Sequence, residues 1–405
     1  MTKRRHFSRR HFSRRQVMGQ VMGLAAGAGL ASAFPGLTVR AQERELVIGG
    51  SIPLTGVFAF AGVAIEAGIS DYVKLTNEAG GIAGRKLRLA YEDTAYKVDQ
   101  SVAVFNKLTT QNDIHLYYGD STGFAKTINE ELNRRGTILM AGASFGSELN
   151  NPEKFPFQFM AGPDYVEMIA ILLEYIAKTQ KGAKIVFVNS DTEFGRDPIE
   201  ASVKRAKEMG LEVVGQIVTP PSAVDVSTEI LKLRRANPDY TIFHGYVLAP
   251  LPEFLNQAKQ LGLKSKFMGT FWSMDNSLWA NVGEPADGFM GVMPYRYYYD
   301  TAPDAPILEK IRKLRPTYQA TGYMQGFLTA MLMGEAAKRT LDAGRELNGR
   351  NLKAALNSIK DFDTGGIMGV PISVPGNSVP VGRIYQFSAA DKQMKPASDW
   401  ISLKK

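Results

Sequence analysis

The sequence predicts an α/β protein with two Rossmann-like lobes, each built on a parallel sheet. From Glu45 onward, strand-like and helix-like segments alternate, which is the order of parallel sheets flanked by helices on both faces. The chain of 405 residues is also longer than one hydrophobic core usually sustains, so two domains are expected. In sheets of this kind ligands bind beyond the carboxyl ends of the strands.

Residues 1–41 are predicted to be an export leader that is removed from the mature chain. They hold eight basic residues and no acidic one, followed by a mildly apolar, Gly/Ala-rich run from Val17 to Leu37. The other interpretation is an uncleaved membrane anchor. Several glycines, Gln20 and Pro35 interrupt the run, which favours a leader.

The leader carries a specific export pattern. The segment 13–18, Ser-Arg-Arg-Gln-Val-Met, resembles the twin-arginine signal, and the segment 8–12 is a second, partial copy. Cleavage is expected after Ala41, with the Ala-Ser-Ala at 31–33 as the alternative.

The mature chain is predicted to be formally neutral. The whole chain has 48 basic and 40 acidic residues, and removing the eight basic residues of the leader leaves 40 of each. No basic field remains to argue for nucleic acid or an anionic membrane surface. The absence of cysteine excludes disulfides, thiolate metal sites and a lipid-modified cysteine. We therefore expect a free soluble protein in the periplasm.

The first part of the mature chain predicts four strands with helices between them. The strand at 86–92 shows the alternation of a half-buried strand, and Gly80, Gly81 and Gly84 mark a turn before it. Strands are expected at 45–53, 86–92, 114–118 and 137–141, and helices at 62–79, 98–110 and 127–135.

A second series begins after Gly162 and Pro163 and predicts another parallel unit. Strands are expected at 184–189, 212–218, 240–244, 267–270 and 288–294, with a final strand at 382–387. Helices are expected at 165–178, 199–209, 226–235, 251–260, 305–313, 321–340 and 352–359.

The turn at 117–122, Tyr-Tyr-Gly-Asp-Ser-Thr, joins a predicted strand to a helix-patterned segment from Gly123 to Arg135. Such a junction presents free N–H groups, two hydroxyls and the positive end of a helix dipole, which together suit an anion. Asp, Ser and Thr are also the residues of an ordinary helix N-cap. The residues alone leave both interpretations open.

The segment 142–146, Gly-Ala-Ser-Phe-Gly, matches the nucleophile elbow of serine hydrolases. A catalytic triad would also need a histidine after Ser144 and an acid to hold it. The mature chain offers His115, which precedes the serine, and His244, which ends a strand of the other unit. Residues 147–156 lack the helix pattern of an elbow, so we expect no enzyme and keep an exported hydrolase using Ser144 as an alternative.

Cofactor and metal motifs are not found. The glycines at 80, 81 and 84 lack the Gly-x-Gly-x-x-Gly spacing and follow a helix, which predicts a helix stop and no dinucleotide site. Two isolated histidines without cysteine give no metal constellation, so we expect neither metal nor cofactor. The tyrosines at 295, 297, 298 and 299 suit interdomain packing and ligand contact equally well.

Aromatic and hydroxyl residues follow the predicted strands at several places. Because the carboxyl edges of two parallel sheets would face one another, we expect these residues to converge on one ligand site. Loop packing is the alternative for each residue taken alone. From the first sheet the candidates are Phe58, Phe60, Ser121, Thr122, Ala143 and Ser144, and from the second Phe194, Tyr246, Phe271 and Trp272.

Several strings spread over the mature chain occur together in one family. In this order, behind an export leader, they resemble the periplasmic solute-binding proteins of branched-chain amino-acid-type ABC transporters. This is the leucine/isoleucine/valine-binding protein family, with the type I periplasmic-binding fold also seen in amide-binding regulators. The strings are Ile52-Pro53-Leu54-Thr55-Gly56, Asn-Glu-Ala-Gly-Gly-Ile-Ala-Gly-Arg at 77–85, Tyr-Glu-Asp-Thr at 91–94, residues 190–195, Gly269 with its following loop, and Val-Gly-Arg-Ile-Tyr-Gln-Phe at 381–387.

The resemblance implies two lobes joined by a three-crossing hinge, with crossings near Gly162, Met290 and Gly366. Lobe 1 would hold residues 42–162 with 291–366, and lobe 2 residues 163–290 with 367–405.

The resemblance also implies a site and a mechanism. The loops at Ser121–Thr122 and Ala143–Ser144 would hold a ligand carboxylate through hydroxyls and backbone N–H groups, and Tyr246 and Phe194 would close over it from lobe 2. Capture would proceed by hinge closure, followed by docking on an ABC permease in the inner membrane. The expected protein is a monomer, exported by the twin-arginine machinery, that binds a small-molecule carboxylate.

One position departs from the family pattern. Amino-acid-binding members carry a carboxylate just after the Met-Gly at 268–269, where it pairs with the ligand's ammonium. Here Thr270, Phe271 and Trp272 follow, and the nearest acid is Asp275. Because a buried ammonium without a counter-charge is costly, we predict an aromatic or otherwise apolar carboxylate without a free α-amine.

Asp120 is the residue that complicates this prediction. Beside a ligand carboxylate it would repel, so it must either turn away as a helix cap or receive a ligand donor such as an amine or hydroxyl. Binding of a branched-chain amino acid or an amide therefore remains open as an alternative. A separate alternative is a ligand sensor that partners a regulator.

Overall fold

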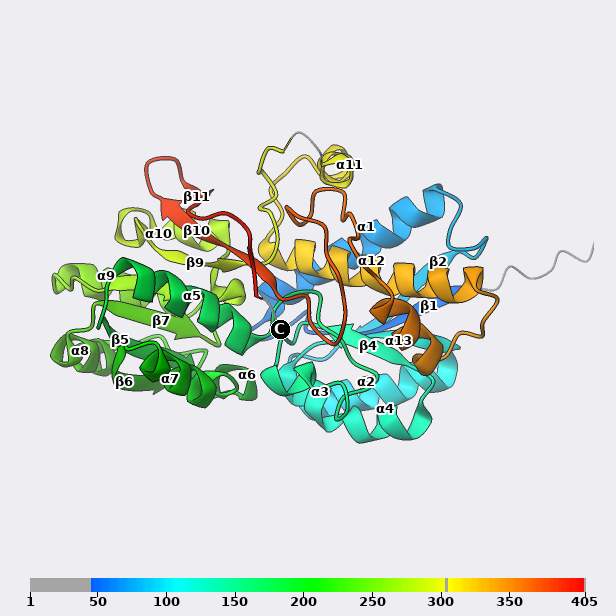
Figure 1. Cartoon of the computed structure of the whole chain (residues 1–405), viewed down its shortest axis with the longest axis horizontal. Helices are drawn as coiled ribbons and strands as arrows, with labels where there is room; N and C mark the ends of the chain where they lie inside the picture. Colours follow the sequence, from blue (N-terminus) through cyan, green and yellow to red (C-terminus); the bar gives the residue numbers. More distant parts are fainter. Residues whose placement is uncertain (1–44, 303–304, 404–405) are drawn as a thin grey trace, which may run out of the picture. The chain divides into compact units, whose positions relative to one another are not determined.

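A computed structural model describes residues 45–302 and 305–403 (Figure 1). The predicted leader at 1–41, with its twin-arginine segment, lies outside the described residues. The rest is organised around one sheet of four strands and one of eight. This confirms the predicted α/β architecture of two lobes with mostly parallel sheets.

The first lobe is built on a wholly parallel sheet with the strand order β2-β1-β3-β4. Strand β1 is central and buried along its whole length, which is why its sequence Leu-Val-Ile-Gly-Gly-Ser-Ile is apolar or small throughout. The strands are β1 (Leu46–Ile52), β2 (Leu87–Asp93), β3 (Ile114–Gly119) and β4 (Leu139–Gly142). The helices are α1 (Ala59–Glu78), α2 (Val98–Gln111), α3 (Thr122–Thr127), α4 (Asn129–Arg135), α12 (Thr321–Asp342) and α13 (Gly349–Asn357), with a short 3₁₀ segment η1 (Ser147–Asn150).

Helix α12 packs beside α1 although it comes late in the chain (Figure 1). Most of its 22 residues are buried, and its charged residues, Glu335, Lys338, Arg339 and Asp342, all lie in its C-terminal part. A Cβ placed on Gly68 of α1 would lie 2.2 Å from the carbonyl oxygen of Tyr323, and one on Gly326 would lie 2.4 Å from that of Ile65. Glycine therefore lets the two helices meet backbone to backbone, which holds this late segment in the first lobe.

The second lobe is built on a sheet with the order β11-β10-β9-β8-β7-β5-β6, with β12 paired to β10. Its strands are β5 (Lys184–Ser190), β6 (Glu212–Thr219), β7 (Tyr240–His244), β8 (Lys266–Gly269), β9 (Met290–Met293), β10 (Val381–Ser388), β11 (Gln393–Pro396) and β12 (Ile401–Ser402). Its helices are α5 (Tyr165–Thr179), α6 (Glu193–Arg196), α7 (Ile199–Glu208), α8 (Ser227–Ala236), α9 (Leu251–Gln260) and α10 (Asn276–Val282), with the 3₁₀ segments η2 (Phe271–Ser273) and η3 (Glu284–Ala286).

The last strands depart from the parallel pattern expected of the second unit. Strand β10 pairs antiparallel with β9, β11 and β12. It enters the sheet on the chain's return from α13 of the first lobe, and the short turn at 389–392 folds it back into β11. A hairpin of this kind needs no crossover helix, so its strands run antiparallel.

The chain passes between the lobes three times: between β4 and α5, between β9 and α12, and between α13 and β10. The second of these segments also holds α11 (Pro306–Leu314). Because β9 belongs to the eight-stranded sheet, the second passage begins after Met293. The lobe boundaries given above remain a prediction.

The four tyrosines at the start of the second passage are used for packing. All four hydroxyls donate to other parts of the protein, and none of these residues lines the small cavity described below. Of the two interpretations left open by the sequence, interdomain packing is the one that the structure shows. The acceptors are Ala161 O for Tyr295 (2.7 Å), Met274 O for Tyr297 (2.5 Å), Arg315 O for Tyr298 (2.5 Å) and Asn276 Oδ1 for Tyr299 (2.9 Å).

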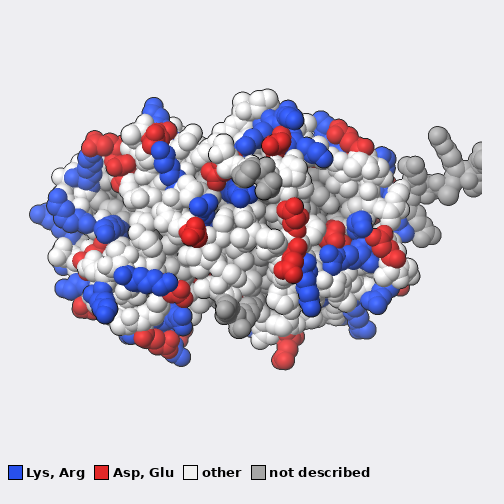
Figure 2. Space-filling view, turned by 45° about the horizontal axis from the view of Figure 1, so that its top comes forward, with Lys and Arg blue, Asp and Glu red and all other residues white. Residues whose placement is uncertain are grey.

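Acidic and basic side chains are interspersed over the face shown in Figure 2, without a large area of one sign. This agrees with the neutral charge balance of the chain after residue 41. Within residues 45–302 and 305–403, no helix is both long and apolar enough to cross a membrane.

Candidate ligand-binding site

A small cavity lies where the carboxyl ends of the two sheets meet. Its outline encloses about 340 Å³ of atom-free space, part of it open to solvent, but only about 30 Å³ is accessible to the centre of a water molecule. Since one water needs roughly 10–15 Å³ by this measure, the cavity has room for about two waters. It is lined by Pro53, Phe58, Ala61, Ile65, Tyr96, Asp120, Ser121, Thr122, Ala143, Tyr165, Phe194, Val247 and Trp272.

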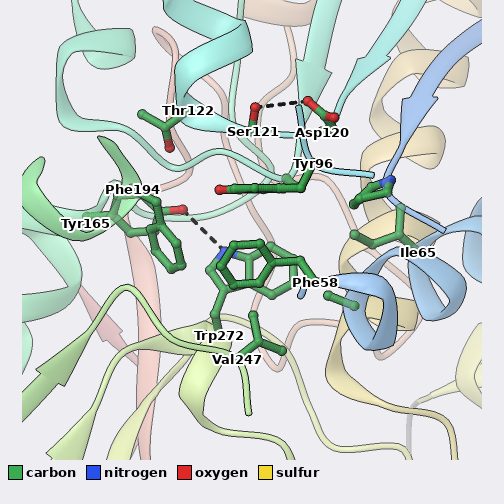
Figure 3. Close-up of a pocket in the computed structure, with 13 residues that line it drawn as sticks. Phe58, Ile65, Tyr96, Asp120, Ser121, Thr122, Tyr165, Phe194, Val247 and Trp272 are labelled. Atoms are coloured by element: carbon green, nitrogen blue, oxygen red, sulfur yellow. Dashed lines mark hydrogen bonds between the residues drawn. The ribbon is translucent and has the colours of Figure 1, made fainter. Parts of the chain in front are cut away.

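The polar end of the cavity is the junction of β3 and α3 (Figure 3). Ser121 has an extended backbone with φ of −157°, and its Oγ accepts a hydrogen bond from the Phe124 N–H at 3.1 Å. Ser121 is therefore the N-cap of α3, and the remaining N–H groups of the first turn point beyond the helix end. The turn thus serves as a cap and also presents the start of α3 to the cavity.

The hydroxyl groups at this end are already oriented by one another. Ser121 Oγ donates to Asp120 Oδ1 at 2.9 Å, so its only proton is directed away from a ligand carboxylate. Thr122 Oγ1 lies 2.9 Å from Ser144 Oγ, which accepts from the Gly146 N–H at 3.0 Å. The N–H groups of α3 are therefore better placed than Ser121 to donate to an anion, and so is Thr122 when Ser144 is the donor of the bond between their hydroxyls.

Asp120 lines the cavity with only 1% of its surface exposed. Its Oδ2 accepts hydrogen bonds from Thr94 Oγ1 and, at 2.7 Å, from Ser101 Oγ. Burial raises the pKa of Asp120 above the usual range of an aspartate, although the hydrogen bonds from Thr94, Ser101 and Ser121 oppose the shift. Because Ser121 is the cap, the suggestion that Asp120 turns away as a cap is wrong.

Half of the remaining lining residues are aromatic (Figure 3). Phe58 and Tyr96 of the first lobe are in edge contact at 4.2 Å between centroids, and Tyr165 and Phe194 of the second lobe lie 5.0 Å apart. Trp272 Nε1 donates to the Tyr165 hydroxyl at 3.3 Å, which fixes both rings. The wall therefore suits a flat or apolar ligand body.

His244 holds the second-lobe part of this wall in place. Its Nε2 lies 2.9 Å from the Phe194 carbonyl oxygen, and its Nδ1 lies 2.8 Å from Thr270 Oγ1. A carbonyl can only accept, so Nε2 carries the proton and Nδ1 accepts from Thr270. Burial lowers the pKa of His244 to about 3, so the ring is neutral.

Six of the ten site residues predicted from the sequence line this cavity. The other four lie behind it: Ser144 bonds Thr122, Phe60 packs against the core from α1, and the Tyr246 hydroxyl pairs with Thr219 Oγ1 at 2.7 Å. Phe271 packs against Phe145 and Tyr295, with centroids 5.6 and 5.3 Å away. The six are Phe58, Ser121, Thr122, Ala143, Phe194 and Trp272.

Seven lining residues were not among the predicted ones. Tyr96 follows the end of β2, so the rule that selected the other strand-end residues would also have found it. Val247 lies one residue beyond the predicted Tyr246, and Tyr165 begins α5 just after the first passage. For Asp120 the sequence left open a helix cap or an acceptor for a ligand amine or hydroxyl. Pro53, Ala61 and Ile65 carry no signal that separates them from core residues.

The hydrolase alternative is wrong. Ser144 Oγ is paired with Thr122 and Gly146, and both nitrogens of His244 are engaged with Phe194 and Thr270. No group of three His, Asp or Glu side chains among the described residues is placed to hold a metal ion.

Comparison with known proteins identifies the family. The model of the family described as "Periplasmic binding protein" matches residues 45–395, so the chain belongs to that family. The Leu/Ile/Val-binding protein of Escherichia coli K12 is 28% identical over 295 residues, which are 71% of this chain and 77% of that protein.

Two solved structures show the same fold. A branched chain amino acid ABC transporter protein from Thermus thermophilus with bound valine has a TM-score of 0.82 and 22% identity, covering 89% of this chain and 97% of that chain. A solute binding protein of an ABC transporter from Rhodopseudomonas palustris BisB5, in complex with 3,4-dihydroxy benzoic acid, has a TM-score of 0.76 and 20% identity, covering 89% and 98%.

These findings confirm the type I periplasmic-binding fold and a role as the solute-binding component of an ABC transporter. Proteins of this family are not enzymes. The role implies a small-molecule ligand and a membrane permease as partner.

We predict that His244 makes the protein less stable in acid. As the pH falls from about 6.5 towards 3, the unfolded chain protonates this histidine and the folded chain does not, so the free energy of unfolding falls by up to about 1.4 kcal/mol per pH unit. His244→Gln keeps a donor and an acceptor but cannot titrate. Its melting temperature should therefore decline less between pH 7 and pH 4 than that of the wild type. An equally steep decline in both proteins would contradict the assignment.

Proposed function

We propose that the chain is the periplasmic component of an ABC importer that captures a small carboxylate, aromatic or otherwise apolar, without a free α-amine. The observation that carries this proposal is the composition of the cavity. One end is the start of α3 with Ser121 and Thr122, which suits a carboxylate, and five of the other lining residues are aromatic. A twin-arginine leader and a monomeric mature protein belong to the same proposal.

The second lobe brings no acidic side chain to the cavity wall. After β8 the chain continues as Thr270, Phe271 and Trp272, of which only Trp272 lines the cavity. Asp275 caps α10 by accepting from the Ser277 N–H at 2.8 Å, and its other oxygen accepts from the Thr321 N–H at 2.7 Å. This acid is therefore occupied in joining α10 to α12, which supports a ligand without an ammonium near β8.

Ligands bound by structural neighbours are compatible with this class. The Rhodopseudomonas palustris protein holds an aromatic carboxylate and the Thermus thermophilus protein holds valine. Both ligands are small and carry a carboxylate.

Amino-acid binding is the second candidate, and Asp120 is the observation that favours it. Asp120 is the only carboxyl group among the lining residues, none of which is basic. An α-ammonium beside it would find its counter-charge in the first lobe instead of the second.

Capture requires the lobes to open and close, because the cavity as it stands has room for about two waters. Charged groups outside the cavity join the lobes in this closed form. Lys126 Nζ of α3 lies 2.9 Å from Glu148 of its own lobe, and 3.3 and 3.7 Å from Glu193 and Asp197 of the other. Asp197 Oδ2 also accepts from the Ser147 N–H at 2.8 Å. These contacts support hinge closure, since opening would break them.

A calorimetric screen of ligands would test the ligand class. Aromatic and other apolar carboxylates should bind, whereas leucine and valine should give no measurable heat, because none of the described acidic residues lines the cavity beside β8. Tight leucine or valine binding without a response to aromatic acids would favour the second candidate and contradict the first.

Removal of the hydroxyl groups at the start of α3 should weaken the binding of a carboxylate. For a carboxylate ligand, Ser121→Ala combined with Thr122→Ala is expected to cost about 2 to 4 kcal/mol of binding free energy, through the lost hydroxyl of Thr122 and the disturbed helix start. Titration calorimetry measures this. Thr127→Ala is the control, because its hydroxyl bonds Gly123 O on the exposed side of the same helix. Unchanged affinity in the double variant would show that the ligand carboxylate does not bind at the start of α3.

Lys126→Met should weaken ligand binding without touching the cavity. Loss of its contacts across the lobes is expected to raise Kd about two- to fivefold, or roughly 0.5–1 kcal/mol, and the difference should shrink in high salt. Lys107→Met is the matched control, since its partner Glu92 (2.6 Å) lies in the same lobe. Equal Kd values for both variants at low salt would show that Lys126 does not stabilise the closed form.

A further inference from the structure

The turn behind the polar end of the cavity is completed by a residue of the other lobe. Ser147 begins η1, and the N-cap of this segment, Gly146, has no side chain to accept from the N–H groups of the first turn. Asp197, which lies between α6 and α7, does so instead, because its Oδ2 accepts from the Ser147 N–H at 2.8 Å. A carboxylate of the second lobe thereby caps a 3₁₀ segment of the first.

The same side chain also faces α3, which lies beside α6 where the lobes meet (Figure 1). Asp197 Oδ1 is 3.7 Å from Lys126 Nζ of α3, and the Asp197 side chain is only 1% exposed. Burial raises the pKa of Asp197 above the usual range of an aspartate, whereas the Ser147 N–H and the Lys126 ammonium oppose the shift. The two oxygens of Asp197 therefore contact two segments of the first lobe, η1 and α3.

The backbone at Gly146 brings Asp197 next to the hydroxyl pair of the site. A Cβ at this position would lie 3.1 Å from Thr122 Cγ2, 3.2 Å from Ser144 Oγ and 3.5 Å from Asp197 Oδ1. The three side chains therefore meet around one residue of the turn. Of these three, Thr122 lines the cavity, so Asp197 lies directly behind the polar part of the wall.

The same turn influences which hydroxyl can donate to a ligand. Ser144 Oγ accepts from the Gly146 N–H at 3.0 Å and lies 2.9 Å from Thr122 Oγ1. When Ser144 donates to Thr122, the single proton of Thr122 remains for a ligand acceptor. The Gly146 N–H favours this arrangement, because it already occupies an acceptor position of Ser144.

We propose that Asp197 is a positioning residue for the polar end of the cavity. Closure brings its carboxylate onto the Ser147 N–H, which fixes the turn from Ser144 to Ser147 and directs the Thr122 proton into the cavity. A carboxylate that accepts from Thr122 therefore stabilises the closed form, and closure strengthens that bond by the same factor. The inference rests on the proposed function, because the group that accepts from Thr122 is the ligand carboxylate.

A double-mutant cycle measured by titration calorimetry tests this role. The probe is the acid, among benzoate, phenylacetate and isovalerate, that the wild type binds most tightly. Asp197→Ala should raise its Kd about tenfold or more, because the closed form loses a hydrogen bond to a charged group. In a Thr122→Val background the same change should raise Kd about threefold or less, which is the part contributed by Lys126. Lys126→Met should raise Kd by the same factor in both backgrounds.

Asp197→Asn decides the question if Asp197→Ala fails to fold, since it keeps the shape of the side chain and removes the charge. It should raise Kd about fivefold in the wild-type background and about twofold or less beside Thr122→Val. Asp225→Ala is the matched control. Asp225 accepts from the Ser227 N–H at 2.9 Å at the start of α8, a contact within the second lobe, so its loss should leave Kd unchanged.

The possible outcomes separate this inference from the proposed function. Equal increases in Kd in the two backgrounds would show that Asp197 only holds the lobes together, which would overturn the positioning role. An unchanged Kd in Asp197→Ala would overturn it as well. Both results leave the proposed function standing, whereas a wild type that binds none of the three acids would overturn the two together.

Discussion

The side chain of Ser121 is the contact on which the candidate site depends. Its hydroxyl oxygen accepts a hydrogen bond from the Phe124 N–H, which caps the start of α3. The same hydroxyl donates to Asp120, the first residue after β3. One hydroxyl thereby fixes the direction of the helix end and the position of a buried carboxylate. The helix end favours an anion, whereas the buried carboxylate disfavours one. The two groups are only one residue apart in the sequence. A ligand that satisfies both must be anionic at one point and a hydrogen-bond donor at the next, which is a more selective demand than either alone.

The two lobes contribute different kinds of interaction to the cavity. The first supplies the helix end, the hydroxyl groups and Asp120, whereas the second supplies mainly rings, held by the neutral His244 and by the bond from Trp272 to Tyr165. Polar recognition can therefore be complete in the first lobe before closure, and closure adds apolar burial. The charged contacts of Lys126 lie outside the cavity and act on the closed form whatever the ligand is.

Much of the fold could be predicted because the signals are local and periodic. The parallel strands and most helices follow from their apolar patterns. The antiparallel pairing of β10 with β11 and β12 does not, because a period of two residues identifies a strand without giving the direction in which it runs. The site was predictable to the level of loops. Within irregular loops no period says which side chain faces inward, so Val247 and Trp272 line the cavity where Tyr246 and Phe271 were equally plausible. The role of Asp120 depends on Thr94 and Ser101, which are distant in sequence.

The proposed binding mode is tested most directly by a crystal structure of the protein with the ligand that it retains through purification. We expect the carboxylate of this ligand within hydrogen-bonding distance of Thr122 and the first N–H groups of α3, with the body of the ligand between Tyr165, Phe194 and Trp272. A ligand whose carboxylate faces the second lobe, or whose ammonium rests on Asp120, would contradict it.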